Sequence, residues 1–166
     1  DSYQLEDIKA NLSKIDDSET RIELGYLVNG MLYELAGSLD LAIETYSKTS
    51  LPLYNHVALK RVLQITMEQR NHQASLETLE ALCRYSLDYM VPYADLLDLL
   101  GQSEMSIEVL KLYVTQNPSK LNAQLKLAQK LIQLNQNYEA ENILQTVLEK
   151  EPENQTAKHL LKVLNS

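Results

Sequence analysis

Apolar residues recur three and four positions apart along most of this chain, which is the spacing of one face of an α-helix. Residues 3–15 show it at Leu5, Ile8, Leu12 and Ile15. The same spacing predicts further helices at residues 19–36, 40–49, 54–69, 73–86, 88–100, 104–116, 120–134, 138–150 and 155–164. The pattern therefore predicts an all-α chain of short helices joined by short polar turns.

Helix-breaking residues lie between or at the start of these segments. Gly37 is expected to end the helix over residues 19–36, because glycine adopts the left-handed C-terminal cap without steric cost. Pro52 blocks continuation of the next helix, and Pro92 falls early in another, where its missing N–H matters least. Asp16, Asp17 and Ser18 supply N-cap chemistry.

A set of residues recurs at fixed offsets with a period near 34, in which a small residue is followed at +3, +7, +12 and +16 by similar residues. Such a period indicates stacked helical hairpins. The three clear sets are Gly30, Tyr33, Gly37, Ala42 and Tyr46; Ala94, Leu97, Gly101, Ser106 and Leu110; and Ala128, Leu131, Asn135, Ala140 and Leu144. The small residues let two antiparallel helices approach closely, and the large ones fill the remaining space. A weaker set has its small position near Val62 or Leu63.

This pattern resembles the tetratricopeptide repeat family, together with Tyr26 before the first set and the closing prolines Pro118 and Pro152. The resemblance covers residues 23–154 as four repeats, of which the second is degenerate. It divides the chain into an N-terminal helix (1–18), repeats at 19–54, 55–86, 87–120 and 121–154, and a capping helix at 155–166. The implied fold is a right-handed α-solenoid of antiparallel helix hairpins with a C-terminal capping helix.

The resemblance also implies a function, because the family binds a peptide or helix of a partner on a concave groove lined mainly by the first helix of each repeat. Helical phase within those helices predicts the groove residues. They are Leu27, Val28, Met31, Glu34 and Leu35 in the first repeat; Lys60, Arg61, Gln64 and Met67 in the second; Asp88, Val91, Asp95 and Asp98 in the third; and Asn122, Lys126, Gln129 and Gln133 in the fourth.

One known binding mode of the family is disfavoured by these residues. Carboxylate-clamp members hold an acidic C-terminal tail with Lys, Asn and Arg from adjacent repeats, whereas the third repeat here offers Asp88 and Asp95. Two negative charges would repel such a tail.

Composition limits the other classes of partner. The net charge of −8 would repel nucleic acid phosphates, and no apolar run is long enough to insert into a membrane. Cys83 is the only cysteine, so the chain forms no internal disulfide or cysteine-based zinc site. The three histidines are scattered, and no phosphate loop or nucleophile elbow is present. No catalytic residue, metal ligand or cofactor is therefore predicted.

The sequence thus favours a non-catalytic scaffold, monomeric or weakly self-associating, that binds another protein or a peptide. A dedicated chaperone for one client remains open, as does a recruiting module of a larger multi-domain or envelope-assembly protein. The N-terminal helix lacks a preceding partner, which favours a part of a longer repeat array over a dedicated cap. No targeting segment is visible, and the compartment, cytoplasmic or periplasmic, stays open.

Overall fold

The computed structural model describes residues 10–164, and these residues form helices and turns with no strand. Residues 10–12 are helical and belong to the helix predicted over residues 3–15, whose earlier part lies outside the described residues. The remaining helices are α2 (Ser18–Leu35), α3 (Leu39–Tyr46), α4 (Pro52–Glu68), α5 (His72–Cys83), the 3₁₀ turn η1 (Leu87–Tyr89), α6 (Met90–Leu99), α7 (Ser103–Gln116), α8 (Leu121–Gln133), α9 (Asn137–Lys150) and α10 (Gln155–Leu164). The all-α prediction is confirmed.

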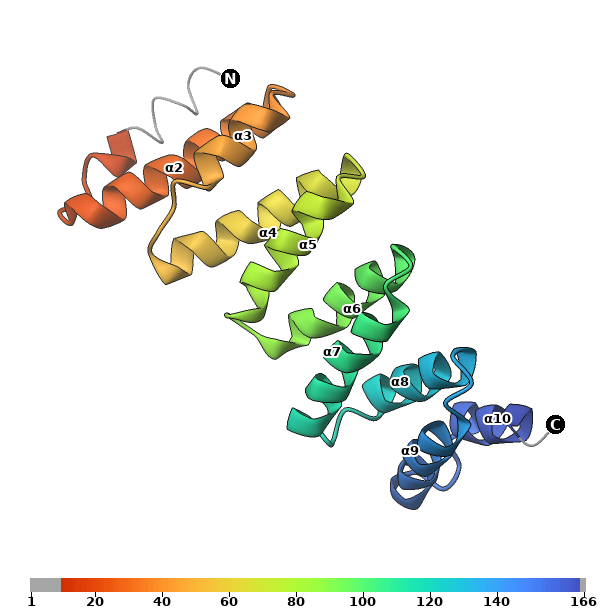
Figure 1. Ribbon diagram of the computed structural model, residues 1–166. Coiled ribbons are helices and arrows are strands. Elements are labelled where there is room, and N and C mark those ends of the chain that lie inside the picture. Colours follow the sequence, from red (N-terminus) through yellow and green to blue (C-terminus); the bar gives the residue numbers. More distant parts are fainter. Residues whose placement is uncertain (1–9, 165–166) are drawn as a thin grey trace. The chain divides into compact units, whose positions relative to one another are not determined.

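The chain divides into two compact units, with the boundary between Tyr85 and Ser86. Unit 1 contains two helix hairpins, in which α2 packs on α3 and α4 on α5 (Figure 1). Unit 2 contains the hairpins of α6 with α7 and of α8 with α9, followed by α10, which packs on α9 and α8. These are the hairpins expected from the repeat pattern; the repeat boundaries given above stay a prediction.

Each hairpin turns at a residue with left-handed backbone. Gly37 and Gly101 have φ of 74° and 76°, and Arg70 and Asn135 take the same region with φ of 55° and 57°. A left-handed residue lets the chain leave a helix while its N–H groups still bond to the last carbonyls. At the first turn, for example, the N–H of Ser38 donates to the carbonyl of Tyr33 at 2.8 Å.

The turn at Arg70 fixes the register of the degenerate second repeat. Counting seven residues back, as from Gly37 to Gly30, gives Leu63, one of the two positions predicted. Twelve residues further on is Ser75, which is fully buried like Ala42. Its Oγ lies 3.0 Å from Oγ1 of Thr66 in the facing helix. The second hairpin therefore places its small residue on the returning helix and a large one on the leading helix.

The core of unit 1 forms where α2, α3 and α4 meet, and its buried apolar residues are Leu27, Ala42, Tyr46, Ala58 and Ile65. Gly30 lies where α2 crosses α3. A Cβ atom at this position would come within 2.7 Å of Cδ1 and Cζ of Tyr46, so the two helices can pack this closely only around glycine.

The core of unit 2 repeats this arrangement with aliphatic residues. Its fully buried large side chains are Leu110, Leu131, Leu144 and Val147, together with the small residues Ala94, Ala128, Ala140 and Ala157. Leu160, Leu161 and Leu164 of α10 pack partly buried against this core, which gives the last helix its capping role.

A buried carboxylate connects the two hairpins of unit 1. Glu23 of α2 is 4% exposed, and the N–H of Ser50 donates to its two oxygens at 3.0 and 2.9 Å while the Ser50 hydroxyl donates at 2.6 Å. Leu51, the N-cap residue of α4, has no capping side chain, so Glu23 supplies an anion at that helix start from another helix. Burial alone would raise the pKa of Glu23, but these hydrogen bonds lower the pKa below its ordinary value of 4.5.

Replacing Glu23 with Gln is expected to lower the free energy of unfolding at pH 7. It should also make that free energy less dependent on pH in the acidic range. The folded-state pKa of Glu23 lies below the unfolded one, so its contribution is present above pH 4.5 and is lost as the pH falls through the folded value. Urea unfolding at several pH values between 3 and 7 should show the two proteins converging toward low pH. A constant difference across this range would contradict the role of the charge.

Candidate protein-binding surface

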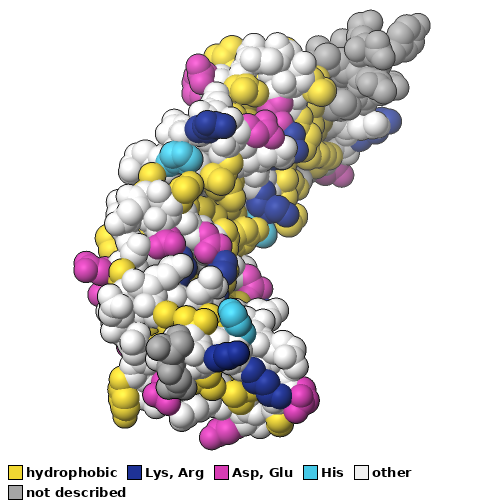
Figure 2. Space-filling model, turned by 90° about the vertical axis from the view of Figure 1, so that its right-hand side faces the viewer, with side chains coloured by type: hydrophobic (Ala, Val, Ile, Leu, Met, Phe, Trp, Pro, Cys, Tyr) yellow, Lys and Arg dark blue, Asp and Glu magenta, His cyan; other side chains and the backbone are white. Residues whose placement is uncertain are grey.

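The surface of α2 and α4 that faces away from α3 and α5 carries exposed apolar side chains. Met31 and Leu35 of α2 are 40% and 86% exposed, and Val57 and Met67 of α4 are 37% and 45% exposed. We call this surface the unit 1 face; it also includes Glu34, Lys60, Arg61 and Gln64. Figure 2 shows hydrophobic side chains on the surface of unit 1 beside charged ones.

Leu27, which was predicted to lie on the binding surface, is instead part of the unit 1 core and is 5% exposed. The reason is its phase on α2. Leu27 points toward the crossing with α3 and α4, whereas Met31, one turn further along, is displaced far enough around the helix to reach solvent. Leu27 therefore supports the surface from beneath.

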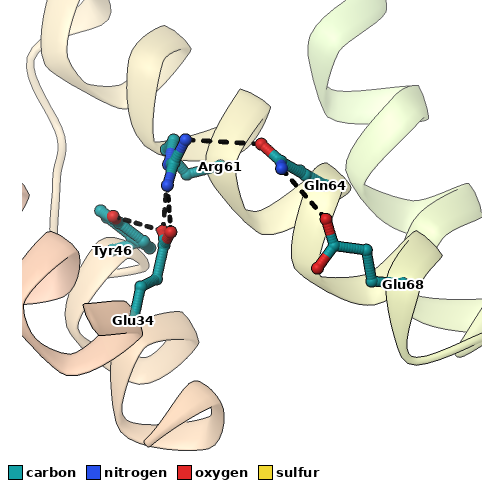
Figure 3. A network of polar contacts seen from close by, with 5 residues as sticks. All are labelled: Glu34, Tyr46, Arg61, Gln64 and Glu68. Carbon is teal, nitrogen blue, oxygen red and sulfur yellow. Dashed lines mark hydrogen bonds and ion pairs between the residues drawn. The ribbon is translucent and has the colours of Figure 1, made fainter. Parts of the chain in front are cut away.

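Charged residues join α2 to α4 across this face (Figure 3). Arg61 forms an ion pair with Glu34 through two of its nitrogens, and the Tyr46 hydroxyl donates to the same carboxylate at 2.6 Å. The chain of contacts continues as Arg61 Nη1 donates to Gln64 at 3.4 Å and Gln64 donates to Glu68 at 3.0 Å. The network fixes the predicted residues Glu34 and Gln64 in place.

The same network affects proton affinities. Burial, and then the hydrogen bond to Glu34, raises the pKa of Tyr46, while the carboxylate raises the pKa of Arg61. Both side chains therefore keep their protons at any physiological pH. Lys60 is exposed and makes no ion pair with any residue between 10 and 164, so it adds a positive charge at the edge of the unit 1 face.

The corresponding surface of unit 2, on α6 and α8, carries charged residues that pair with each other, beside Leu99, which is 69% exposed. Asp95 pairs with Lys126 at 2.6 Å and Asp98 with Lys130 at 2.6 Å, and the Ser103 hydroxyl donates to Asp98 at 2.6 Å. Lys130 holds the pKa of Asp98 below its ordinary value, with help from Ser103. The acidic character predicted for the third repeat is thus largely neutralised by the fourth.

Asp88 has the same type of arrangement at the start of unit 2. The Tyr113 hydroxyl donates to its carboxylate, and Lys120 lies 3.4 Å away. The hydrogen bond lowers the pKa of Asp88 and raises the pKa of Tyr113 to about 12. The acidic residues that argue against a carboxylate clamp therefore have cationic or hydroxyl partners within the protein.

The predicted residues of the fourth repeat lie around two hollows. Gln129 and Lys126 line a hollow of about 190 Å³ with Asp95, Asp98 and Lys130. Asn122 lines a second, of about 510 Å³, at the start of α8; its other lining residues include Val91, Tyr113, Lys120 and Lys126. The structure thus brings together the predicted residues Asp95, Asp98, Lys126 and Gln129, with Asn122 at their edge.

Lys130 was missed as a member of this cluster. A signal was present in the sequence, because Asp95 precedes Lys126 by 31 residues and Asp98 precedes Lys130 by 32, both close to the repeat period. Side chains of opposite charge offset by one repeat are placed to meet on neighbouring first helices. Lys130 itself is only 9% exposed and reaches the surface through its ammonium group.

Residues 10–164 contain neither a metal-binding cluster nor a membrane-spanning helix. No cluster of three or more His, Cys, Asp or Glu side chains there is arranged to hold a metal ion. None of the helices in that part of the chain is both long and apolar enough to cross a bilayer. Cys83 is half-buried, and burial raises the pKa of its thiol.

Paired antiparallel helices with small residues at the crossings define a helical-repeat protein. Residues 91–164 match the family model of the tetratricopeptide repeat, and this match supports assignment of the chain to that family. Proteins of this fold are generally non-catalytic scaffolds for protein interactions. No curated protein matches the chain significantly.

Solved structures with the same fold have low sequence identity. A tetratricopeptide repeat protein from Parabacteroides merdae is 19% identical with a TM-score of 0.68, covering 87% of this chain and 59% of its own. YrrB, described as having an unusual peptide-binding site, is 18% identical with a TM-score of 0.59. The match covers 84% of this chain and 74% of YrrB. The first repeat domain of Spaghetti bound to an HSP90 peptide is 19% identical with a TM-score of 0.55. The match covers 66% of this chain and 90% of the Spaghetti domain.

Proposed function

We propose that this chain is an interaction scaffold that binds an apolar segment of a partner protein on the unit 1 face. The observation that carries the proposal is the exposure of Met31, Leu35, Val57 and Met67 on the first helices of both hairpins in unit 1. Large apolar side chains gathered on one face commonly mark an interaction surface. Methionine in particular adapts its shape to different partners.

The polar groups of the same face suit such a partner. Glu34, Arg61, Gln64 and Glu68 satisfy one another, so a bound segment would not have to neutralise a lone charge. A segment with apolar residues at helical spacing would cover Met31 and Met67 while its polar side faces solvent. Two of the similar structures, YrrB and Spaghetti, are described with peptide binding, which supports a peptide-like ligand here.

The contrast between the two units favours unit 1 as the principal site. On α6 and α8 the charged residues are paired with each other, and a ligand that used Asp95 or Lys126 would have to break an existing ion pair. On α2 and α4 the exposed apolar side chains Met31, Leu35, Val57 and Met67 gain from being covered.

A peptide-display selection against the full chain tests the proposal. We expect enrichment of peptides with apolar residues three or four positions apart, and binding at least tenfold weaker to a Met31→Glu/Met67→Glu variant. The matched control is Met105→Glu/Leu112→Glu, which places the same charges at residues of α7 that are 50% and 51% exposed. Failure to enrich such peptides, or equal loss of binding in both variants, would refute the assignment.

A further inference from the structure

A cavity in unit 1 lies between the returning helices α3 and α5, with α4 at its floor. Its volume is about 400 Å³, within the range of pockets that hold small ligands. The unit 1 face described above is formed by the other side of α2 and α4, so a ligand in this cavity would be separate from one bound there.

The cavity combines an apolar floor with an acidic rim. Ile43, Leu59 and Val62 are half-buried apolar residues in its lining, and Asp40 and Glu77 are exposed carboxylates on its two sides. No Lys or Arg is among the described residues that line it. The floor suits a hydrocarbon chain and the rim suits a cation.

Both carboxylates are available to a ligand. Within residues 10–164 neither forms an ion pair, and the one side-chain hydrogen bond recorded is that from Gln73 to Glu77 at 2.9 Å. This differs from the acidic residues Asp88, Asp95 and Asp98 of unit 2, each of which has a lysine partner. The lining also includes the neutral polar residues Ser47, Asn55, Thr66, Gln69, Asn71 and Thr78. A cavity with an apolar floor and two carboxylates without ion-pair partners is complementary to a positively charged group with an apolar stem.

We propose that the cavity between α3 and α5 binds an arginine side chain of a partner protein. The aliphatic part of arginine would lie on Ile43, Leu59 and Val62, while its planar guanidinium would donate to Asp40 and Glu77. Arginine fits better than lysine, because a guanidinium has five donors in a fixed plane and can contact two carboxylates at once. This site extends the recognition of a partner beyond the apolar segment proposed for the unit 1 face, and it does not depend on that proposal.

A pair of probes of equal shape tests it. N-acetyl-arginine amide and N-acetyl-citrulline amide differ in charge, since citrulline has a neutral urea in place of the guanidinium. In an NMR titration of the full chain, we expect the arginine probe to shift the methyl signals of Ile43, Leu59 and Val62, and the citrulline probe to bind about tenfold more weakly.

Charge variants separate this site from general attraction to an acidic protein. Asp40→Asn/Glu77→Gln should weaken binding of the arginine probe about tenfold. Asp16→Asn/Glu80→Gln removes the same amount of charge outside the cavity and should leave binding of the arginine probe unchanged. Equal binding of both probes to the parent chain, methyl shifts elsewhere only, or equal effects of the two variants would overturn the proposal. The probe comparison uses the parent protein, so the test does not depend on the variants folding.

Discussion

Replacing Gly30 with Ala is expected to destabilise unit 1 by about 2 kcal/mol, although alanine is the better helix former. A Cβ atom at residue 30 would overlap the ring of Tyr46, and the ring has little room to move because its hydroxyl is held by Glu34 and it is fully buried. Urea unfolding followed by circular dichroism measures the change.

Gly25 is a matched control in the same helix. No atom lies within 4 Å of a Cβ built at this position, so Gly25→Ala adds helix propensity without a clash. We expect it to stabilise the protein by about 0.5–1 kcal/mol. If both variants shifted stability in the same direction, close packing of Gly30 against Tyr46 would not be what determines the residue there.

Replacing Leu110 with Ala should cost about 2–5 kcal/mol in unit 2, the largest effect expected from a single substitution considered for this chain. Leu110 is fully buried and packs in the core formed by α6 to α9. Removing three carbon atoms from such a position loses their transfer free energy and leaves a cavity that the surrounding helices fill only in part.

Leu112 provides the comparison, because it lies two residues further along α7 and is 51% exposed. Leu112→Ala should change stability by less than about 0.5 kcal/mol. Urea unfolding gives the size of both effects, and amide hydrogen exchange should locate the loss for Leu110→Ala in residues 86–164. Similar costs for the two variants would show that the buried side of α7 has been misidentified.

Most of the fold could be predicted from the sequence, because a repeated hairpin needs the same types of residue at the same positions in each copy. Glycine or alanine at a helix crossing and a left-handed residue at a turn are local needs, and Gly30, Gly37, Ala94 and Gly101 show them directly. The second hairpin was harder to place, because its small crossing residue, Ser75, lies only on the returning helix and its turn residue is Arg70. A leucine at the leading crossing position and an arginine at the turn are not characteristic of those positions.

The surface could be predicted only in part. Helical phase placed Met31 on the exposed side of α2, but one residue of error in phase separates a surface side chain from a core one, as Leu27 shows. The ion pairs depend on how far long side chains reach between neighbouring helices, so Lys130 was missed although Asp98 was identified. The cavity between α3 and α5 has no local sequence signal, because it is formed by three helices together.

The left-handed turn at Arg70 has a consequence for how repeats of this kind diverge. A non-glycine residue in that conformation costs roughly 1–2 kcal/mol, an amount that the packing of a whole hairpin can absorb. The backbone conformation of a hairpin can therefore persist after the residues characteristic of the repeat have been substituted. Each repeat is free to exchange its signature residues for others until two copies of one ancestral hairpin share a backbone and little else.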